Sequence, residues 1–84
     1  MDNLPKSDEI RNWLVSYLAN LLEIRIDKIS TTTNFDRYGL DSVAAVTLSG
    51  DLAEWLGCEL DPALLYYYPT IESIVQFLTK EETI

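Results

Sequence analysis

Apolar residues recur at spacings of three and four over the first part of the chain, which is the pattern of a helix with one buried face. Ser7 stands where an N-cap is expected, and Asp8 and Glu9 follow it with charges that suit the positive end of a helix dipole. The pattern predicts a helix over residues 7–22 whose apolar stripe faces the core. The stripe consists of Ile10, Trp13, Leu14, Tyr17, Leu18, Leu21 and Leu22.

The periodicity stops over residues 23–41, where Asp, Ser, Thr and Asn side chains compete for backbone hydrogen bonds and favour turns. A connection this long in so short a chain needs hydrophobic contacts of its own to stay ordered. Gly39 supplies backbone freedom just before the next helix. The residues expected to hold this loop on the core are Ile26, Ile29, Phe35 and Leu40.

A second helix is predicted over residues 42–56, with Asp41 capping its first turn and Gly57 as the left-handed residue that ends it. Gly50 in its interior weakens the helix by about 1 kcal/mol relative to Ala, which indicates close packing or a local bend. The predicted apolar face comprises Val43, Val46, Leu52 and Leu56, with Leu48 and Trp55 nearby.

Two prolines delimit a short third helix. Asp61 and Pro62 are placed as its N-cap and first residue, and Pro69 ends it, because the residue before a proline is driven out of the α region. Thr70 then caps a final helix that runs to about Lys80. Its inward residues are Ile71, Ile74, Val75, Phe77 and Leu78.

The predicted elements define the fold class, because no strand-like alternation competes with the helices. We expect an all-α protein, a small antiparallel four-helix bundle with three main helices, one short helix and a long first loop. The 84 residues suffice for one core and not for two, so we expect a single domain over residues 1–84, with an ordered core at about residues 7–80.

Charge narrows the choice of partner. Six Lys and Arg against 14 Asp and Glu give a formal net charge of −8, and residues 38–79 contain no Lys or Arg at all. Nucleic-acid affinity depends on cations that replace counterions on phosphates, so we expect no nucleic-acid partner. A basic protein surface is the natural partner for such a chain.

The inventory of reactive residues removes most enzyme chemistry. With no His and with Cys58 as its one cysteine, the chain lacks the means to form an internal disulfide, a His-based triad or a Cys/His metal site. We therefore expect no enzyme activity and no bound metal. No apolar run approaches the roughly 18 to 20 residues of a membrane span, so we expect no membrane attachment. We also expect a cytoplasmic location and a monomer.

Three consecutive tyrosines, Tyr66, Tyr67 and Tyr68, have the composition of a stacking platform for nucleic-acid bases. The anionic surroundings oppose that interpretation. We expect the rings to cover the edge of the bundle and the short third helix, with their hydroxyls in solvent.

Candidate chemistry centres on Ser42, which follows Asp41 at the predicted start of the second helix. A serine in that place is usually a cap, but Asp41 is the better cap one residue earlier, which leaves the Ser42 hydroxyl to face solvent. A phosphate attached there would meet free N–H groups and the positive end of the helix dipole. The position suits a modified serine.

The run YGLDSVAAVTLSGDLAEWLG resembles the phosphopantetheine-attachment motif of acyl carrier proteins, in which the serine of D-S-L opens the second helix. The resemblance extends over nearly the whole chain, since the amphipathic first helix, the loop Phe before G-L-D-S, the L-G helix end and the Y-P-T-I segment follow in the same order. Val43 stands where Leu is commoner, a conservative change. The Y-P-T-I and D-L-A-E-W-L-G stretches resemble carriers of polyketide synthases and mixed polyketide/nonribosomal peptide lines.

The resemblance implies that Ser42 accepts 4′-phosphopantetheine from coenzyme A through a phosphodiester, and that Asp41 belongs to the motif that a phosphopantetheinyl transferase recognises. The thiol of that arm would hold an acyl group as a thioester, while partner enzymes supply the chemistry. Beyond the transferase, the implied partners are an acyl-loading enzyme, either an acyltransferase or an acyl-AMP ligase, and a ketosynthase or condensation enzyme of a polyketide or lipopeptide pathway.

The second helix is expected to dock these partners through a mixed apolar and anionic surface made of Asp41, Val43, Val46, Asp51 and Glu54. Two alternatives stay open. One is a peptidyl carrier of a nonribosomal peptide pathway, against which the motif G-L-D-S argues, since G-G-x-S is typical of those carriers. The other is an unmodified acidic helical module that binds a basic partner.

Overall fold

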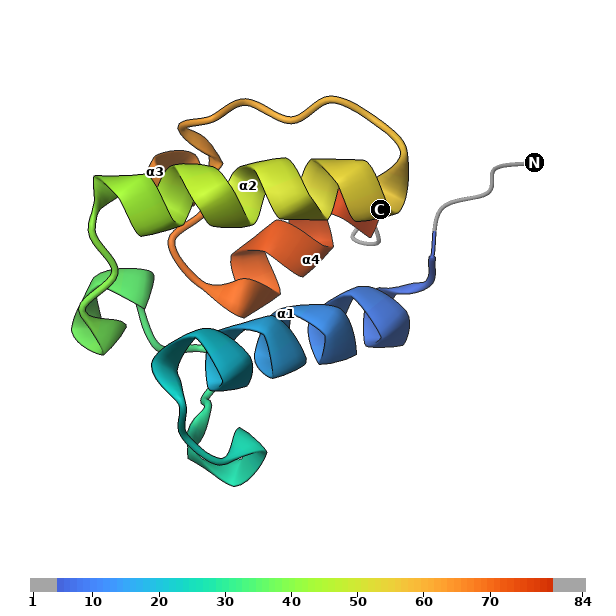
Figure 1. The fold of residues 1–84 in the computed structure, drawn as a ribbon. Helices are drawn as coiled ribbons and strands as arrows, with labels where there is room; N and C mark the ends of the chain where they lie inside the picture. Colours follow the sequence, from blue (N-terminus) through green and yellow to red (C-terminus); the bar gives the residue numbers. More distant parts are fainter. Residues whose placement is uncertain (1–4, 80–84) are drawn as a thin grey trace.

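The computed structural model describes residues 5–79, which fold into α-helices and short 3₁₀ helices with no strand among them (Figure 1). The first and second long helices run in opposite directions (Figure 1). The predicted all-α bundle of three main helices and one short one is confirmed. The elements are α1 (Ser7–Leu22), η1 (Ile26–Lys28), η2 (Phe35–Tyr38), α2 (Ser42–Leu56), α3 (Leu64–Tyr67) and α4 (Ile71–Thr79).

The start of α1 differs by one residue from the prediction. Lys6, not Ser7, is the N-cap, and Ser7 is the first helical residue. The Glu9 carboxylate accepts a hydrogen bond from the Lys6 backbone N–H at 3.0 Å, which is half of a capping box and does not need a serine at the cap. The apolar stripe is buried at Ile10, Leu14 and Leu18, whereas Leu21, expected in the core, is exposed.

One core is shared by all four α-helices and η2. Within α2 the buried side is made of Ala45, Leu48, Ser49, Leu52 and Leu56. The predicted apolar face of α2 is divided in the structure, because Leu52 and Leu56 are buried whereas Val43 and Val46 are 71% and 50% exposed. The fully buried core side chains outside α2 are Ile10, Leu14, Leu18, Leu64, Ile71, Ile74 and Val75.

Aromatic side chains connect α1 to α2. The Trp13 ring stacks on the Tyr17 ring with centroids 5.0 Å apart and on the Trp55 ring at 5.3 Å. The Tyr17 hydroxyl donates to the Asp51 carboxylate at 2.6 Å. Burial, and then the hydrogen bond and negative charge of Asp51, raise the pKa of Tyr17 to about 12. This flank of α2 is therefore fixed by stacking and one strong hydrogen bond.

The long loop is held on the core by Phe35, which is 4% exposed. Its backbone N–H donates to the Pro69 carbonyl at 2.8 Å, and the Glu72 N–H donates to the Thr31 carbonyl at 3.0 Å. Ile29 and Leu40 pack against the core as expected. Ile26 does not, because the η1 turn leaves its side chain exposed.

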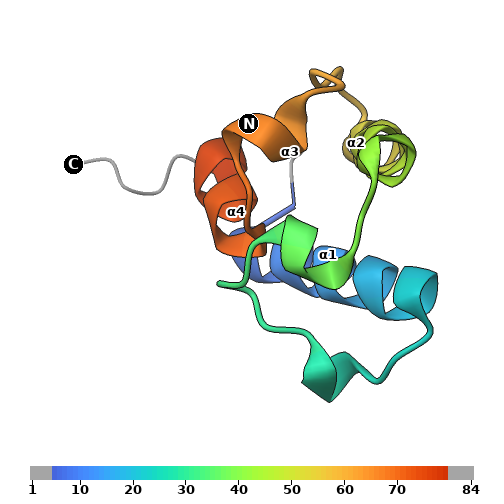
Figure 2. The same ribbon diagram turned by 90° about the vertical axis from the view of Figure 1, so that its left-hand side faces the viewer.

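The short helix α3 begins later than predicted. Asp61 and Pro62 lie in a turn before it, where the Asp61 Oδ1 accepts the Ala63 N–H at 2.8 Å, and the helix starts at Leu64. The Leu64 N–H also donates to the Asp61 carbonyl. The side chain and carbonyl of Asp61 thus close a turn around Pro62, and Asp61 is not the helix cap. Figure 2 shows α3 between α4 and α2.

The final helix α4 is capped as predicted, since the Thr70 hydroxyl accepts the Ser73 N–H at 3.1 Å. Its predicted end at Lys80 lies outside the described residues. Gly50 of α2 lies on the solvent side with no atom near the place of a Cβ, so the expected close packing around it is absent.

A bidentate ion pair connects α1 to α4. The Arg11 Nε and Nη2 atoms donate to the two Glu72 carboxylate oxygens at 2.7 and 3.0 Å. The Arg11 hydrogen bond, helped by one from Thr31, lowers the pKa of Glu72. Charge-assisted pairs of this fork geometry are stronger than ordinary surface pairs.

We expect Glu72→Gln to lower the free energy of unfolding by about 1 kcal/mol at pH 7. A carboxylate whose pKa is lowered by folding stabilises the protein above its ordinary pKa of about 4.3, and that contribution disappears as the pH falls through the lowered value. Urea unfolding of both proteins at pH 7 and in steps down to about pH 2 measures the difference.

The matched control is Asp27→Asn, which breaks the exposed pair between Arg25 and Asp27 and should change stability by less than about 0.5 kcal/mol. An equal loss for Glu72→Gln at pH 7 and at the acid end would mean that the Arg11 pair contributes nothing through its charge.

Candidate functional site

The chain enters α2 through two backbone features. Gly39 ends η2 in the left-handed region at φ 79°, and Asp41 is extended. The Asp41 Oδ1 accepts the Ala44 N–H at 2.8 Å, while the Asp41 carbonyl accepts the Ala45 N–H at 3.0 Å. The predicted N-cap role of Asp41 is confirmed, and this cap fixes how the next residue is presented.

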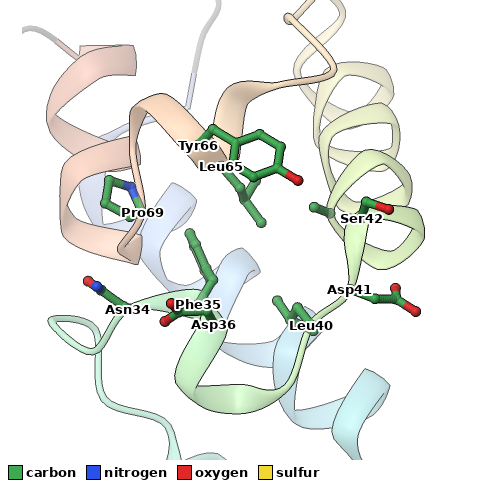
Figure 3. A pocket seen from close by; sticks show the side chains of 10 residues that line it. Asn34, Phe35, Asp36, Leu40, Asp41, Ser42, Leu65, Tyr66 and Pro69 are labelled. Carbon is green, nitrogen blue, oxygen red and sulfur yellow. The ribbon is translucent and has the colours of Figure 1, made fainter.

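Ser42 is the first residue of α2 and is exposed. Its side chain points outward from the helix start in Figure 3. Within residues 5–79 its hydroxyl has no hydrogen-bond partner, and neither does the backbone N–H of Ser42 or Val43. An anion carried by this serine would therefore meet unpaired N–H groups at the positive end of the helix dipole.

A cleft of about 200 Å³ opens beside Ser42, between the start of α2, the loop around η2, and α3 (Figure 3). Its walls are mainly apolar, with Asp36 and Asp41 among the lining residues. This volume is below the roughly 300 Å³ of a typical ligand pocket, so the cleft suits a short group or part of a flexible arm. It is lined by Asn34, Phe35, Asp36, Leu40, Asp41, Ser42, Ala45, Leu65, Tyr66 and Pro69.

Several of these lining residues were not singled out as site residues from the sequence, notably Asp36, Leu65 and Pro69. The run of three tyrosines, residues 66–68, is apparent in the sequence, but the sequence does not show which of the three rings lies beside Ser42. The structure places Tyr66 there, across the cleft from Ser42 (Figure 3). That assignment depends on how α3 packs, which no local pattern reveals.

The predicted docking residues are all exposed, namely Asp41, Val43, Val46, Asp51 and Glu54. Val43 and Val46 are exposed near the Ser42 end of α2, and Glu54 is exposed two turns further along. Because Asp51 and Glu54 are three residues apart, they are neighbours on one side of α2. The exposed side of the helix therefore has an apolar part near Ser42 and an acidic part further along, where Asp51 also accepts the Tyr17 hydrogen bond.

Two other classes of site receive no support from the described residues. Among residues 5–79, no cluster of three or more His, Cys, Asp or Glu side chains is arranged to hold a metal ion. No helix in the same range has both the length and the apolar character that crossing a membrane requires.

Comparison with known proteins shows the family to which this chain is similar. Residues 12–78 match the family described as "Phosphopantetheine attachment site". The chain is 35% identical over 72 residues to the acyl carrier protein TtuC of Teredinibacter turnerae, covering 86% of this chain and 83% of TtuC. It is 34% identical over 70 residues to the polyketide synthase PksL of Bacillus subtilis, covering 83% of this chain but only 2% of PksL.

A solved structure shows the same fold. A free-standing peptidyl carrier protein from a secondary metabolic pathway of Acinetobacter baumannii superimposes with a TM-score of 0.82. It is 31% identical, and the match covers 93% of this chain and 98% of that protein. The similarity thus extends to carriers that are named for two different classes of cargo, acyl and peptidyl.

We expect Asp41→Ala to lower the free energy of unfolding by about 1 kcal/mol, because the Ala44 N–H loses its acceptor at the helix start. Asp41→Asn keeps an acceptor oxygen and should stay within about 0.5 kcal/mol of the unchanged protein. Urea unfolding of the three proteins measures both effects. Equal losses for Ala and Asn would show that the cap hydrogen bond does not stabilise α2.

Proposed function

The chain belongs to the phosphopantetheine-attachment family, whose prosthetic group is covalently bound 4′-phosphopantetheine, and we propose that Ser42 carries that group here. The observation that supports this most is the exposed Ser42 hydroxyl at the first position of α2, with the capping role taken by Asp41. The bound group supplies a terminal thiol that holds an acyl chain as a thioester.

The residues of the chain present and accommodate the arm. Asp41 fixes the backbone from which Ser42 projects. The Ser42 Oγ would form the phosphodiester by displacing adenosine 3′,5′-bisphosphate from coenzyme A, with loss of the hydroxyl proton. The N–H groups of Ser42 and Val43 are available to the phosphate oxygens. The apolar cleft toward Leu65 and Tyr66 offers a neighbouring surface for the arm or a short acyl group.

We place the carrier in a polyketide or mixed polyketide/lipopeptide pathway. Two of the relatives by sequence, TtuC and PksL, are named as an acyl carrier protein and a polyketide synthase. The partners follow from that role: a phosphopantetheinyl transferase, an acyltransferase or acyl-AMP ligase for loading, and a ketosynthase or condensation enzyme that accepts the acyl group.

A peptidyl carrier is the second candidate, because the Acinetobacter baumannii structure of the same fold carries that name. The G-L-D-S motif around Ser42 favours the acyl carrier. Incubation of the modified protein with adenylating enzymes and amino acids distinguishes the two. An aminoacyl thioester formed at a rate comparable to acyl loading would favour the peptidyl carrier.

The outward face of α2 is the docking surface that we propose for these partners. Val43 and Val46 supply exposed apolar area next to Ser42, and Gly50 leaves the following turn without a side chain. Glu54 contributes negative charge beyond it. Apolar contact would then select the partner, while charge raises the rate of encounter.

We expect incubation with coenzyme A and a promiscuous phosphopantetheinyl transferase to add the mass of one phosphopantetheinyl group, and Ser42→Ala to abolish the addition. Ser16→Ala, which removes an exposed hydroxyl in α1, is the matched control and should be modified like the unchanged protein. Intact-mass spectrometry reads all three. The assignment of Ser42 would be contradicted if the unchanged protein is not modified or if the Ser42→Ala variant is. If the Ser42→Ala variant still binds its partner as the unchanged protein does, the unmodified acidic module is favoured.

Glu54→Lys should slow this modification several-fold at low salt, mainly through the association rate, with the difference shrinking as ionic strength rises. Glu54 is the cleaner test than Asp51, whose replacement also breaks the Tyr17 hydrogen bond. Gln76→Lys, an exposed position on α4, introduces a lysine elsewhere and serves as the control.

Stopped-flow or time-resolved mass measurements over a salt series give the rates. If Glu54→Lys and Gln76→Lys behave alike, charge on α2 does not steer the transferase. Docking would then depend on the apolar residues, and Val43→Ser would be the variant that slows modification.

A further inference from the structure

The short helix α3 separates two cavities. Tyr66 lines the cleft beside Ser42, whereas its neighbour Tyr67 lines a second cavity of about 440 Å³ between α3, the segment that precedes it and α4. That volume lies within the roughly 300 to 1,000 Å³ of ligand-binding pockets. The second cavity is lined by Glu59, Leu60, Asp61, Leu64, Tyr67, Tyr68 and Phe77.

Aromatic rings form much of this second cavity. The Tyr68 and Phe77 rings are stacked with centroids 4.4 Å apart and planes 18° from parallel. Leu64, another lining residue, is 2% exposed and belongs to the core, so this part of the cavity wall is held in place by core packing. Tyr67 is 66% exposed, and its ring is therefore available to a ligand. Aromatic faces of this kind attract cations.

Two carboxylates complete the cavity. Glu59 and Asp61 form no ion pair within residues 5–79. Asp61 is held in place because its Oδ1 accepts the Ala63 N–H at 2.8 Å. All the lining residues fall within residues 38–79, which contain no Lys or Arg, so the cavity wall itself carries no positive charge. A neutral apolar ligand would contact the rings but gain nothing from these two exposed carboxylates, whereas a cation would also pair with them.

We propose that this second cavity binds an arginine side chain of a partner protein. A planar guanidinium stacks on aromatic rings and donates hydrogen bonds to carboxylates in a fixed fork, so one group satisfies both features of the cavity. An ammonium is compact and more strongly hydrated, and it stacks less well. The contact lies on the side of α3 away from Ser42, so it is a second anchor that does not depend on the prosthetic group.

The test uses the unmodified 84-residue protein in a two-dimensional ¹H–¹⁵N NMR titration with Nα-acetyl-L-arginine amide, whose blocked ends imitate a residue within a protein. We expect saturable shifts of the amides of Tyr67, Tyr68 and Phe77, with a dissociation constant of about 1 to 10 mM, as suits a single side chain. The corresponding citrulline amide, of the same shape without the charge, should produce no saturable shifts, and the lysine amide should bind several-fold more weakly.

Matched variants connect the shifts to the cavity. Tyr67→Ala and Glu59→Gln should each weaken arginine binding about fivefold or more, whereas Tyr66→Ala, at a site that is similarly exposed at 72%, should leave it unchanged. The dispersed spectrum of each variant confirms that it is folded.

The proposal is overturned if arginine amide gives no saturable shifts, if citrulline or lysine amide binds as well, or if Tyr67→Ala binds like the unchanged protein. None of these outcomes bears on the modification of Ser42, because the titration uses protein that carries no prosthetic group.

Discussion

The arrangement of the whole molecule depends on the way that Phe35 fixes the long loop. Its side chain is buried in the shared core, and its N–H donates to the Pro69 carbonyl at 2.8 Å, just before α4 begins. This contact brings the approach to α2 against the end of α3. Without it, Ser42 would sit at the end of a 19-residue connection with no defined neighbour, because a loop of that length has many conformations to lose.

With the loop fixed, α2 is held in place by contacts on two of its sides. One flank faces α1, where Trp55 stacks on Trp13 and Asp51 accepts from Tyr17. Another flank reaches the cleft that Ser42 and Ala45 share with α3. The face between them is left to solvent, and for a carrier this is the face that partner enzymes can reach. Rigid support from two sides suits a protein whose reactive atom lies on a flexible arm rather than on its own fold.

The sequence predicts the first residues of a helix correctly where the helix start depends on a single local hydrogen bond. Asp41 and Thr70 are caps because the short oxygen-bearing side chain of each accepts a hydrogen bond from the N–H three residues ahead. Ser7 and Asp61 have side chains of the same kind, but neither is the N-cap that the sequence predicts. At Ser7 the Glu9 carboxylate serves the cap from the helix side, and at Asp61 the side chain closes a tight turn before α3 instead.

The sequence by itself determined that Ser42 opens a helix with Asp41 as its cap, since both facts rest on contacts within four residues. Only the tertiary structure decided which apolar residues face solvent, and so exposed Val43 and Val46 while Ala45 and Leu48 became core. It also decided that Tyr66 and Tyr67 line different cavities. Burial of Leu64 and Leu65 sets the rotation of α3, and a four-residue helix has too few turns for its own periodicity to reveal that rotation.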